Sequence, residues 1–105
     1  MNVLMTEELY GLYTTGASRT YKDVARNKTL YNGFVRAVKT METVERTDDL
    51  KAFSYLHYEK LKYQFSGYSS VRLANGYVHR LIFNEKEDGI EVELINIDDT
   101  HYGNK

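Results

Sequence analysis

Residues 68–84 read YSSVRLANGYVHRLIFN, and this stretch decides the fold. Apolar and β-branched residues recur with a period of two on both sides of Asn75-Gly76, a dipeptide typical of tight hairpin turns. We therefore predict two neighbouring strands, over residues 68–73 and 77–84.

The second of these strands has two unlike sides. Alternation places Leu81 and Phe83 on one side, which we expect to pack against helices. Arg80 then lies on the opposite side, which we expect to stay open. A single arginine on a strand is usually a surface charge or an ion-pair partner, so its neighbours decide whether it has a function.

Two further strands are predicted beside this pair, over residues 61–65 and 89–97. Ser66-Gly67 and residues 86–89 are turn signals between the strands. Because connections this short join antiparallel neighbours, we expect a twisted antiparallel sheet.

The N-terminal half predicts helices. Residues 3–5 form a short apolar run that suits a first strand, and Thr6 suits an N-cap, because acidic residues follow it in the first turn of a helix. That helix should end by Gly16. Residues 17–29 read as a polar loop with one helical turn at residues 23–26.

A longer amphipathic helix is predicted over residues 29–45, where apolar side chains recur at spacings of three and four: Leu30, Phe34, Val38, Met41 and Val44. Gly33 weakens this helix by ~1 kcal/mol relative to alanine, so packing must hold it. Thr47 is expected to cap the turn that follows. The fold class is α+β, with N-terminal helices packed on one face of the sheet in two layers and residues 1–105 as a single domain.

The composition excludes several classes of protein. A chain of 105 residues and 12.3 kDa suits one domain. The absence of cysteine excludes disulfide scaffolds, thiolate zinc sites and cysteine nucleophiles. No apolar stretch reaches the ~18–20 residues of a membrane span and the start does not resemble a signal peptide, so we expect a cytoplasmic protein.

The net charge of −1 hides a strong segregation of charge. Residues 19–46 carry seven Lys or Arg against three acids, and residues 50–80 carry five bases against Glu59 alone. The last 25 residues carry seven acids and two bases. A local basic surface is what phosphates respond to, so the middle of the chain is a candidate nucleic-acid surface. The alternative is that mixed charges only solvate two faces.

The candidate catalytic residues lack metal-ligand spacing, so neither a metal nor a cofactor is expected. Metal-free RNA cleavage needs a base for the 2′-hydroxyl proton, an acid for the leaving 5′-oxygen and cations for the phosphate. Glu59, His101, and Arg80 with Lys62 could fill these roles in that order. The alternative is structural, with Glu59 as an ion-pair partner of Lys62 and His101 solvated near the chain end.

Three stretches in this order resemble a known family: Tyr58–Lys62 (YEKLK), Ser66–Arg72 (SGYSSVR) and His79–Phe83 (HRLIF). The set is similar to the RelE/ParE superfamily of toxins from bacterial type II toxin–antitoxin systems, near its HigB and YoeB branches. His101-Tyr102 resembles the ending of these toxins, and residues 12–16 resemble the N-termini of HigB-type members. The resemblance implies the RelE-like microbial ribonuclease fold.

The resemblance also implies an activity, that of an mRNA interferase: an endoribonuclease toxin that enters the ribosomal A site and cuts the mRNA. It implies Glu59 as the base, Arg80 as the arginine of the site and His101-Tyr102 as the terminal catalytic pair. HigB-like members use a His-x-x-Lys pair instead, and His57 and Lys60 have that spacing. The base therefore stays open between Glu59 and His57.

The expected RNA-binding residues are Lys60, Lys62, Arg72 and Tyr68. The expected partners are the ribosome with its mRNA and a cognate antitoxin, a small DNA-binding protein with a flexible segment that covers the toxin. Many members of the family carry Trp where this chain has Ser69, which removes a stacking surface. Two other functions stay open: a ParE-like inhibitor of DNA gyrase, and a non-catalytic antitoxin-binding domain of the same fold.

Overall fold

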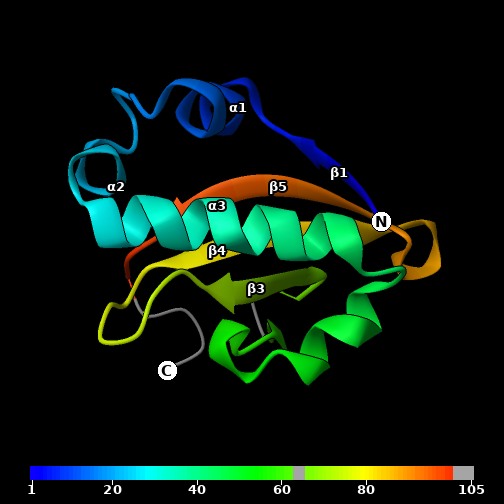
Figure 1. Ribbon diagram of the computed structural model, residues 1–105. Helices are drawn as coiled ribbons and strands as arrows, with labels where there is room; N and C mark the ends of the chain where they lie inside the picture. The colour runs from blue at the N-terminus through cyan, green and yellow to red at the C-terminus, as the bar shows by residue number, and fades with distance from the viewer. Residues whose placement is uncertain (63–65, 101–105) are drawn as a thin grey trace.

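The computed structural model describes residues 1–62 and 66–100. Within these ranges the chain forms a five-stranded sheet with helices on one face (Figure 1). The strands and helices are β1 (Asn2–Met5), α1 (Glu7–Thr15), α2 (Lys22–Arg26), α3 (Lys28–Thr43), β2 (Glu59–Lys60), β3 (Tyr68–Arg72), β4 (Arg80–Lys86) and β5 (Glu91–Asp98). Short 3₁₀ helices join them: η1 (Thr47–Ala52), η2 (Ser54–Leu56) and η4 (Glu87–Gly89).

The strand order in the sheet is β1-β5-β4-β3-β2. The β2–β3, β3–β4 and β4–β5 pairs are antiparallel, as the short connections predict. The expectation of a wholly antiparallel sheet is wrong at one edge, where β1 pairs with β5 in parallel. The reason is that the chain runs through all three α-helices and the other strands between β1 and β5, so no tight turn constrains their directions.

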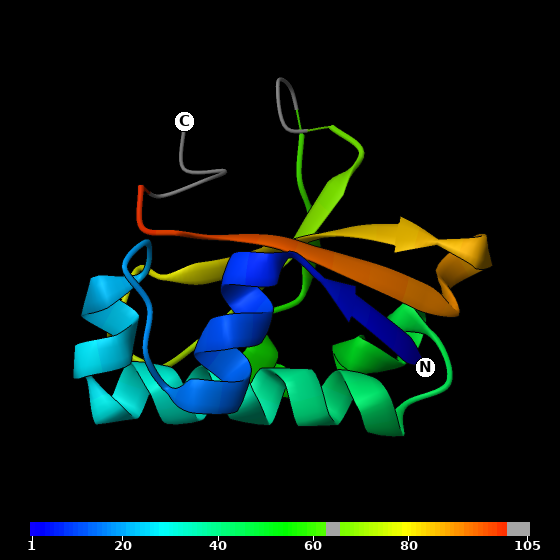
Figure 2. The same ribbon diagram turned by 90° about the horizontal axis from the view of Figure 1, so that it is seen from above.

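The helical layer follows the sequence pattern closely. The side chain of Thr6 accepts a hydrogen bond from the Leu9 amide at 3.3 Å, and α1 ends at Gly16 with a left-handed φ of 74°. Four residues of the predicted stripe, Leu30, Phe34, Val38 and Met41, are buried, whereas Val44 is half-buried and caps α3, which ends at Thr43 rather than 45. In Figure 2 the three α-helices lie on one side of the sheet and leave the other side uncovered by helices.

Close packing between α3 and the end of β3 explains Gly33. A Cβ atom at this position would lie 1.9 Å from the backbone oxygen of Leu73. Helix and sheet therefore approach more closely here than any other residue would allow. Packing compensates the weak helix propensity of glycine, as the sequence requires.

Three predicted local features are wrong in detail: the bounds of two strands and the residue that caps η1. The strand that pairs with β3 is β2, at Glu59–Lys60, and not the predicted strand at 61–65. Residues 63–65 of that prediction lie outside the described ranges. β4 begins at Arg80, because Tyr77 and His79 turn toward α2 and bond to Asn27 and Asp23.

Thr47 does not cap η1, because its hydroxyl donates to Glu85 Oε1 at 2.9 Å. The Asp49 carboxylate caps η1 instead, accepting from the Arg46 amide at 3.1 Å. None of the helices in the described ranges is long and apolar enough to cross a membrane.

Candidate active site

The two sides of the β3–β4 pair carry different chemistry. In the register of the pair, Ser70 lies opposite Ile82, and Arg72 lies opposite Arg80. These four residues share the side that faces away from the helices, whereas Leu81 and Phe83 are fully buried against the helical layer. The predicted two-sidedness of this strand is confirmed, and Arg80 lies on the open side.

Arg80 is held by three groups from two segments of the chain, β3 and residues 57–59. Its Nε donates to Ser70 Oγ at 2.7 Å, and its Nη2 donates to the backbone oxygen of His57 at 2.6 Å. The same Nη2 lies 3.5 Å from Glu59 Oε1. The Arg80 side chain is 13% exposed and that of Glu59 is 50% exposed, so a largely buried cation meets a carboxylate that water can reach.

The electrostatics of this pair follow from its surroundings. Burial lowers the pKa of Arg80 from its usual value, the Glu59 carboxylate opposes that shift, and the neighbouring Arg72 adds to it. The guanidinium stays charged at any physiological pH, because its ordinary pKa is far above neutrality. The arrangement therefore presents a fixed positive fork beside a carboxylate, which suits an anionic ligand such as a phosphate.

The structure brings three of the predicted catalytic residues together, namely Glu59, Arg80 and His57. His57 takes part through its backbone oxygen, and its side chain is exposed. Its backbone has a positive φ of 46°, a conformation that non-glycine residues adopt rarely. In the described ranges the ion-pair partner of Glu59 is Arg80 and not Lys62. His101 and Tyr102 lie outside the described residues.

The predicted RNA-binding residues do not form one patch. Arg72 is beside Arg80 in the register and donates to Asn75 Oδ1 at 3.1 Å. Tyr68 begins β3 on the same side as Ser70 and is half-buried, and Lys62 is exposed just beyond β2. Lys60 pairs with Ser69, so it lies on the opposite side, with its Nζ 3.9 Å from Glu85 Oε1.

Sequence reasoning missed two of the groups that build the site. Ser70 is fully buried and binds Arg80, although alternation from Val71 could have placed it on the open side. The His57 carbonyl leaves no signal in a sequence, because any residue has one. Only the register of β2, β3 and β4 shows that these groups converge.

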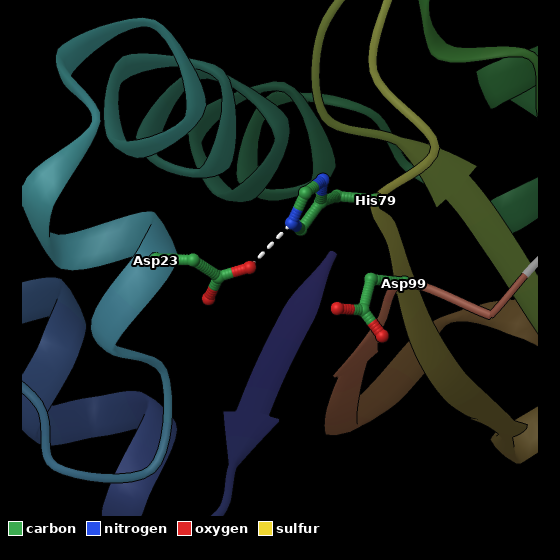
Figure 3. A group of neighbouring side chains, drawn as sticks. All are labelled: Asp23, His79 and Asp99. Atoms are coloured by element: carbon green, nitrogen blue, oxygen red, sulfur yellow. Dashed lines mark hydrogen bonds and ion pairs between the residues drawn. The ribbon is translucent and has the colours of Figure 1, made fainter.

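A second cluster lies where α2 approaches the start of β4 and the end of β5: Asp23, His79 and Asp99 (Figure 3). One potential ligand atom from each lies within 4.8 Å of the others. His79 Nε2 is 2.5 Å from Asp23 Oδ2. Burial raises the pKa of Asp23, but the hydrogen bond from His79 and the Val24 amide outweigh it, and the net shift is downward.

This cluster fits a structural tie better than a metal centre. The Nδ1 atom of His79 is buried and has no hydrogen-bond partner in the described part of the chain. A cation on Nε2 would force the proton onto Nδ1, where a buried donor would have no acceptor among these residues. His79 Nε2 bonds instead to the Asp23 carboxylate and joins α2 to the segment before Arg80.

Comparison with known proteins gives matches in structure and none in sequence. No family model matches the chain, and no curated protein matches it. A YoeB/ParE toxin from Agrobacterium tumefaciens has a TM-score of 0.56 at 16% identity, over 94% of this chain and 98% of that one. The YoeB-YefM complex from Staphylococcus aureus gives 0.57 at 22% identity, over 97% and 98%. A YoeB dimer from the same organism gives 0.52 at 17%, over the same shares of the two chains.

The matches span nearly the whole of both chains in each case. The predicted architecture, N-terminal helices on one face of a twisted antiparallel sheet, is confirmed by the strand order and by these neighbours, except for the parallel β1–β5 pair. The chain has the fold of the YoeB and YoeB/ParE toxins.

Proposed function

We propose that this protein is the toxin of a toxin–antitoxin pair and acts as a ribosome-dependent mRNA endoribonuclease. The observation that carries the proposal is the Arg80–Glu59 pair on the open side of a YoeB-like fold. A fold hosts many functions, so the site has to support the reaction by its own chemistry.

The reaction needs one proton removed, one delivered and a phosphate stabilised between them. Glu59 takes the proton of the 2′-hydroxyl, whose oxygen forms a new bond to phosphorus while the bond from phosphorus to the 5′-oxygen breaks. Arg80 stabilises the charge that grows on the non-bridging oxygens. His101 protonates the leaving 5′-oxygen, with Tyr102 beside it, a role proposed from the sequence alone.

The held geometry of Arg80 supports this assignment. Its bonds to Ser70 and to the His57 carbonyl fix the guanidinium before any ligand arrives, and such preorganisation is what makes charge stabilisation effective. The half-exposed Glu59 can turn from Arg80 toward a substrate without breaking either bond. Glu59 is therefore the preferred base, and His57, with its exposed side chain, is the alternative.

RNA would enter along the open side past Arg72 and Tyr68, with Lys62 in the exposed segment just beyond β2. An acidic strand limits this surface, because Asp98 lies opposite Arg80 in the β4–β5 register. Positive charge is thus concentrated on the β2–β3 side of Arg80 rather than spread over the sheet. We expect the RNA contacts on that side.

A toxin of this kind must be masked until it is needed, and two of the solved neighbours are YoeB-YefM complexes. We propose a cognate antitoxin whose flexible segment orders on this protein. An acidic segment suits the exposed face of α3, which carries Arg36 and Lys39, and the Arg80 region. Co-purification of the chain with the product of the adjacent gene tests this proposal, and the absence of a stable complex would contradict it.

Expression of the chain alone tests the function. We expect protein synthesis to stop and mRNA to be cut within reading frames, and Arg80→Ala to abolish both effects. The matched control is Arg36→Ala on α3, an arginine that stacks 4.2 Å from the centre of the Tyr55 ring on the helical face. Intact mRNA with broken gyrase-bound DNA would favour the ParE-like function, and unimpaired growth would favour a non-catalytic domain.

A further inference from the structure

A further polar cluster lies on the core side of the sheet, toward the end of β4 away from Arg80. Glu85, near the end of β4, accepts hydrogen bonds from the hydroxyls of Ser69 at 2.6 Å, Thr47 at 2.9 Å and Tyr58. The Glu85 side chain is only 18% exposed. One buried carboxylate thus joins η1, β3, β4 and the segment that leads into β2.

The protonation states of this cluster are set by the same contacts. Burial raises the pKa of Glu85, but the hydroxyls of Ser69, Tyr58 and Thr47 outweigh burial and lower it overall. Burial, with the hydrogen bond to Glu85, raises the pKa of Tyr58 to about 12. At neutral pH Glu85 is therefore an anion and Tyr58 a stable donor to it.

The position of Tyr58 in the chain connects the Glu85 cluster to the residues that contact Arg80. Tyr58 lies between His57 and Glu59, the two residues that reach Arg80 on the other side of the sheet. Its ring stacks on Phe83 with ring centres 6.2 Å apart, and its hydroxyl binds Glu85. One residue is thus anchored in the core while both of its neighbours contact the site.

The segment around Tyr58 has a short β-ladder, and the buried Leu56 and Leu61 flank it. β2 has only two residues, and His57 just before it has left-handed backbone geometry. A two-residue strand contributes few ladder hydrogen bonds, so side-chain anchors determine where it lies. Ser69, in the place where many family members carry Trp, faces the core side and supplies one of the donors to Glu85.

We propose that Tyr58 and Glu85 are positioning residues that hold Glu59 and the His57 carbonyl against Arg80. Neither touches the phosphate. They act through the 57–59 segment, and the inference rests on the proposed ribonuclease function for its catalytic consequence. Its structural consequence, the closure of this segment over Arg80, can be measured without any activity.

The structural test is hydrogen exchange of the Arg80 Nη2–H protons, which donate to the His57 oxygen, followed by NMR in Tyr58→Phe. This variant keeps the ring on Phe83 and removes only the hydroxyl. The matched control is Tyr31→Phe, which removes the hydroxyl that donates to the Tyr13 oxygen at 2.8 Å in the helical layer. We expect exchange to rise about tenfold in Tyr58→Phe and to stay unchanged in Tyr31→Phe.

The catalytic test is single-turnover cleavage of ribosome-bound mRNA by the same variants. We expect Tyr58→Phe to lower the maximal rate by up to about 10²-fold with little change in the half-saturating concentration. The loss should be smaller in a Glu59→Gln background, because Tyr58 then positions only the His57 carbonyl. A loss of the same size there, or Tyr58→Phe exchange equal to that of Tyr31→Phe, would overturn the inference. A parent protein that cuts no RNA would overturn the proposed function, and the exchange measurement would still decide this inference.

Discussion

The two sides of strand β4 place neighbouring residues in opposite environments, one apolar and one charged. On the core side, Leu81 and Phe83 are fully buried and gain stability from being excluded from water. On the open side, the largely buried Arg80 has its charge balanced by Glu59 and its donors held by Ser70 and His57. The apolar side stabilises the fold. The charged side carries a desolvation penalty, which is explained if a ligand binds there. We infer that the open side carries the function and that the core side holds it in place.

Substitution of Phe83 is the strongest way to separate the two sides. Phe83→Ala should lower the free energy of unfolding by ~3–5 kcal/mol, because a fully buried aromatic side chain leaves a cavity. Arg80→Ala should change unfolding much less while it removes activity. Denaturant unfolding of both variants measures this contrast. An Arg80→Ala variant as unstable as Phe83→Ala would mean that both sides of β4 are structural.

Gly33 tests how closely the helical layer must approach the sheet. Gly33→Ala should destabilise the protein by ~1–3 kcal/mol despite its better helix propensity, because the new methyl group meets the Leu73 oxygen and α3 must shift. The matched control is Gly11→Ala in α1, where a Cβ meets no atom within 4 Å. Thermal unfolding of both variants gives the comparison. A stabilised Gly33→Ala variant would contradict the packing described for α3.

The pH dependence of stability tests the cluster around Glu85. The pKa of Glu85 is lowered in the folded protein, so its contribution is fully present above the unfolded-state value near 4.5 and is lost as the pH falls through the folded value. Glu85→Gln should therefore flatten the loss of stability below pH ~4.5. Glu45→Gln, at an exposed position after α3, is the control. Equal acid slopes in the parent and in Glu85→Gln would contradict the account of this cluster.

Salt dependence gives the smallest effect and separates the open side of the sheet from the core side. Arg72→Ala, on the open side, and Lys62→Ala, in the exposed segment after β2, should each reduce the salt slope of RNA binding by about one counterion. Lys60→Ala should leave the slope unchanged, because the Lys60 side chain lies on the side of Glu85. A slope that responds to Lys60 alone would place the RNA on the wrong side of the sheet for this account.

The fold was largely predictable because it depends on repeated, local signals. The helical stripe of α3, the Thr6 cap and the alternation of β4 each result from burial or hydrogen bonding that neighbouring residues decide. The parallel β1–β5 pair was not predictable, because residues 89 positions apart form it and no local pattern records their direction.

The site was predictable only in part, for the same reason. Glu59, Arg80 and His57 were found, but their contacts were not: Glu59 pairs with Arg80 across the sheet rather than with its sequence neighbour Lys62. Ser70 and Glu85 were missed because their roles come from the strand register. Lys60 was grouped with Lys62 by proximity in the sequence, but Lys60 pairs with Ser69, which places its side chain on the core side near Glu85.

Single-turnover cleavage of ribosome-bound mRNA tests the central claim most directly. With folding verified for each variant, Arg80→Ala should be slower than the parent by roughly 10²–10³-fold, the loss expected for a donor to a developing oxyanion. Glu59→Gln should be slower by ~10²–10⁴-fold as the base is lost, and His57→Gln should stay near the parent rate. A crippled His57→Gln beside a fast Glu59→Gln would transfer the role of base to His57. Parent-like rates for both Arg80→Ala and Glu59→Gln would contradict the claim that this pair is the catalytic centre.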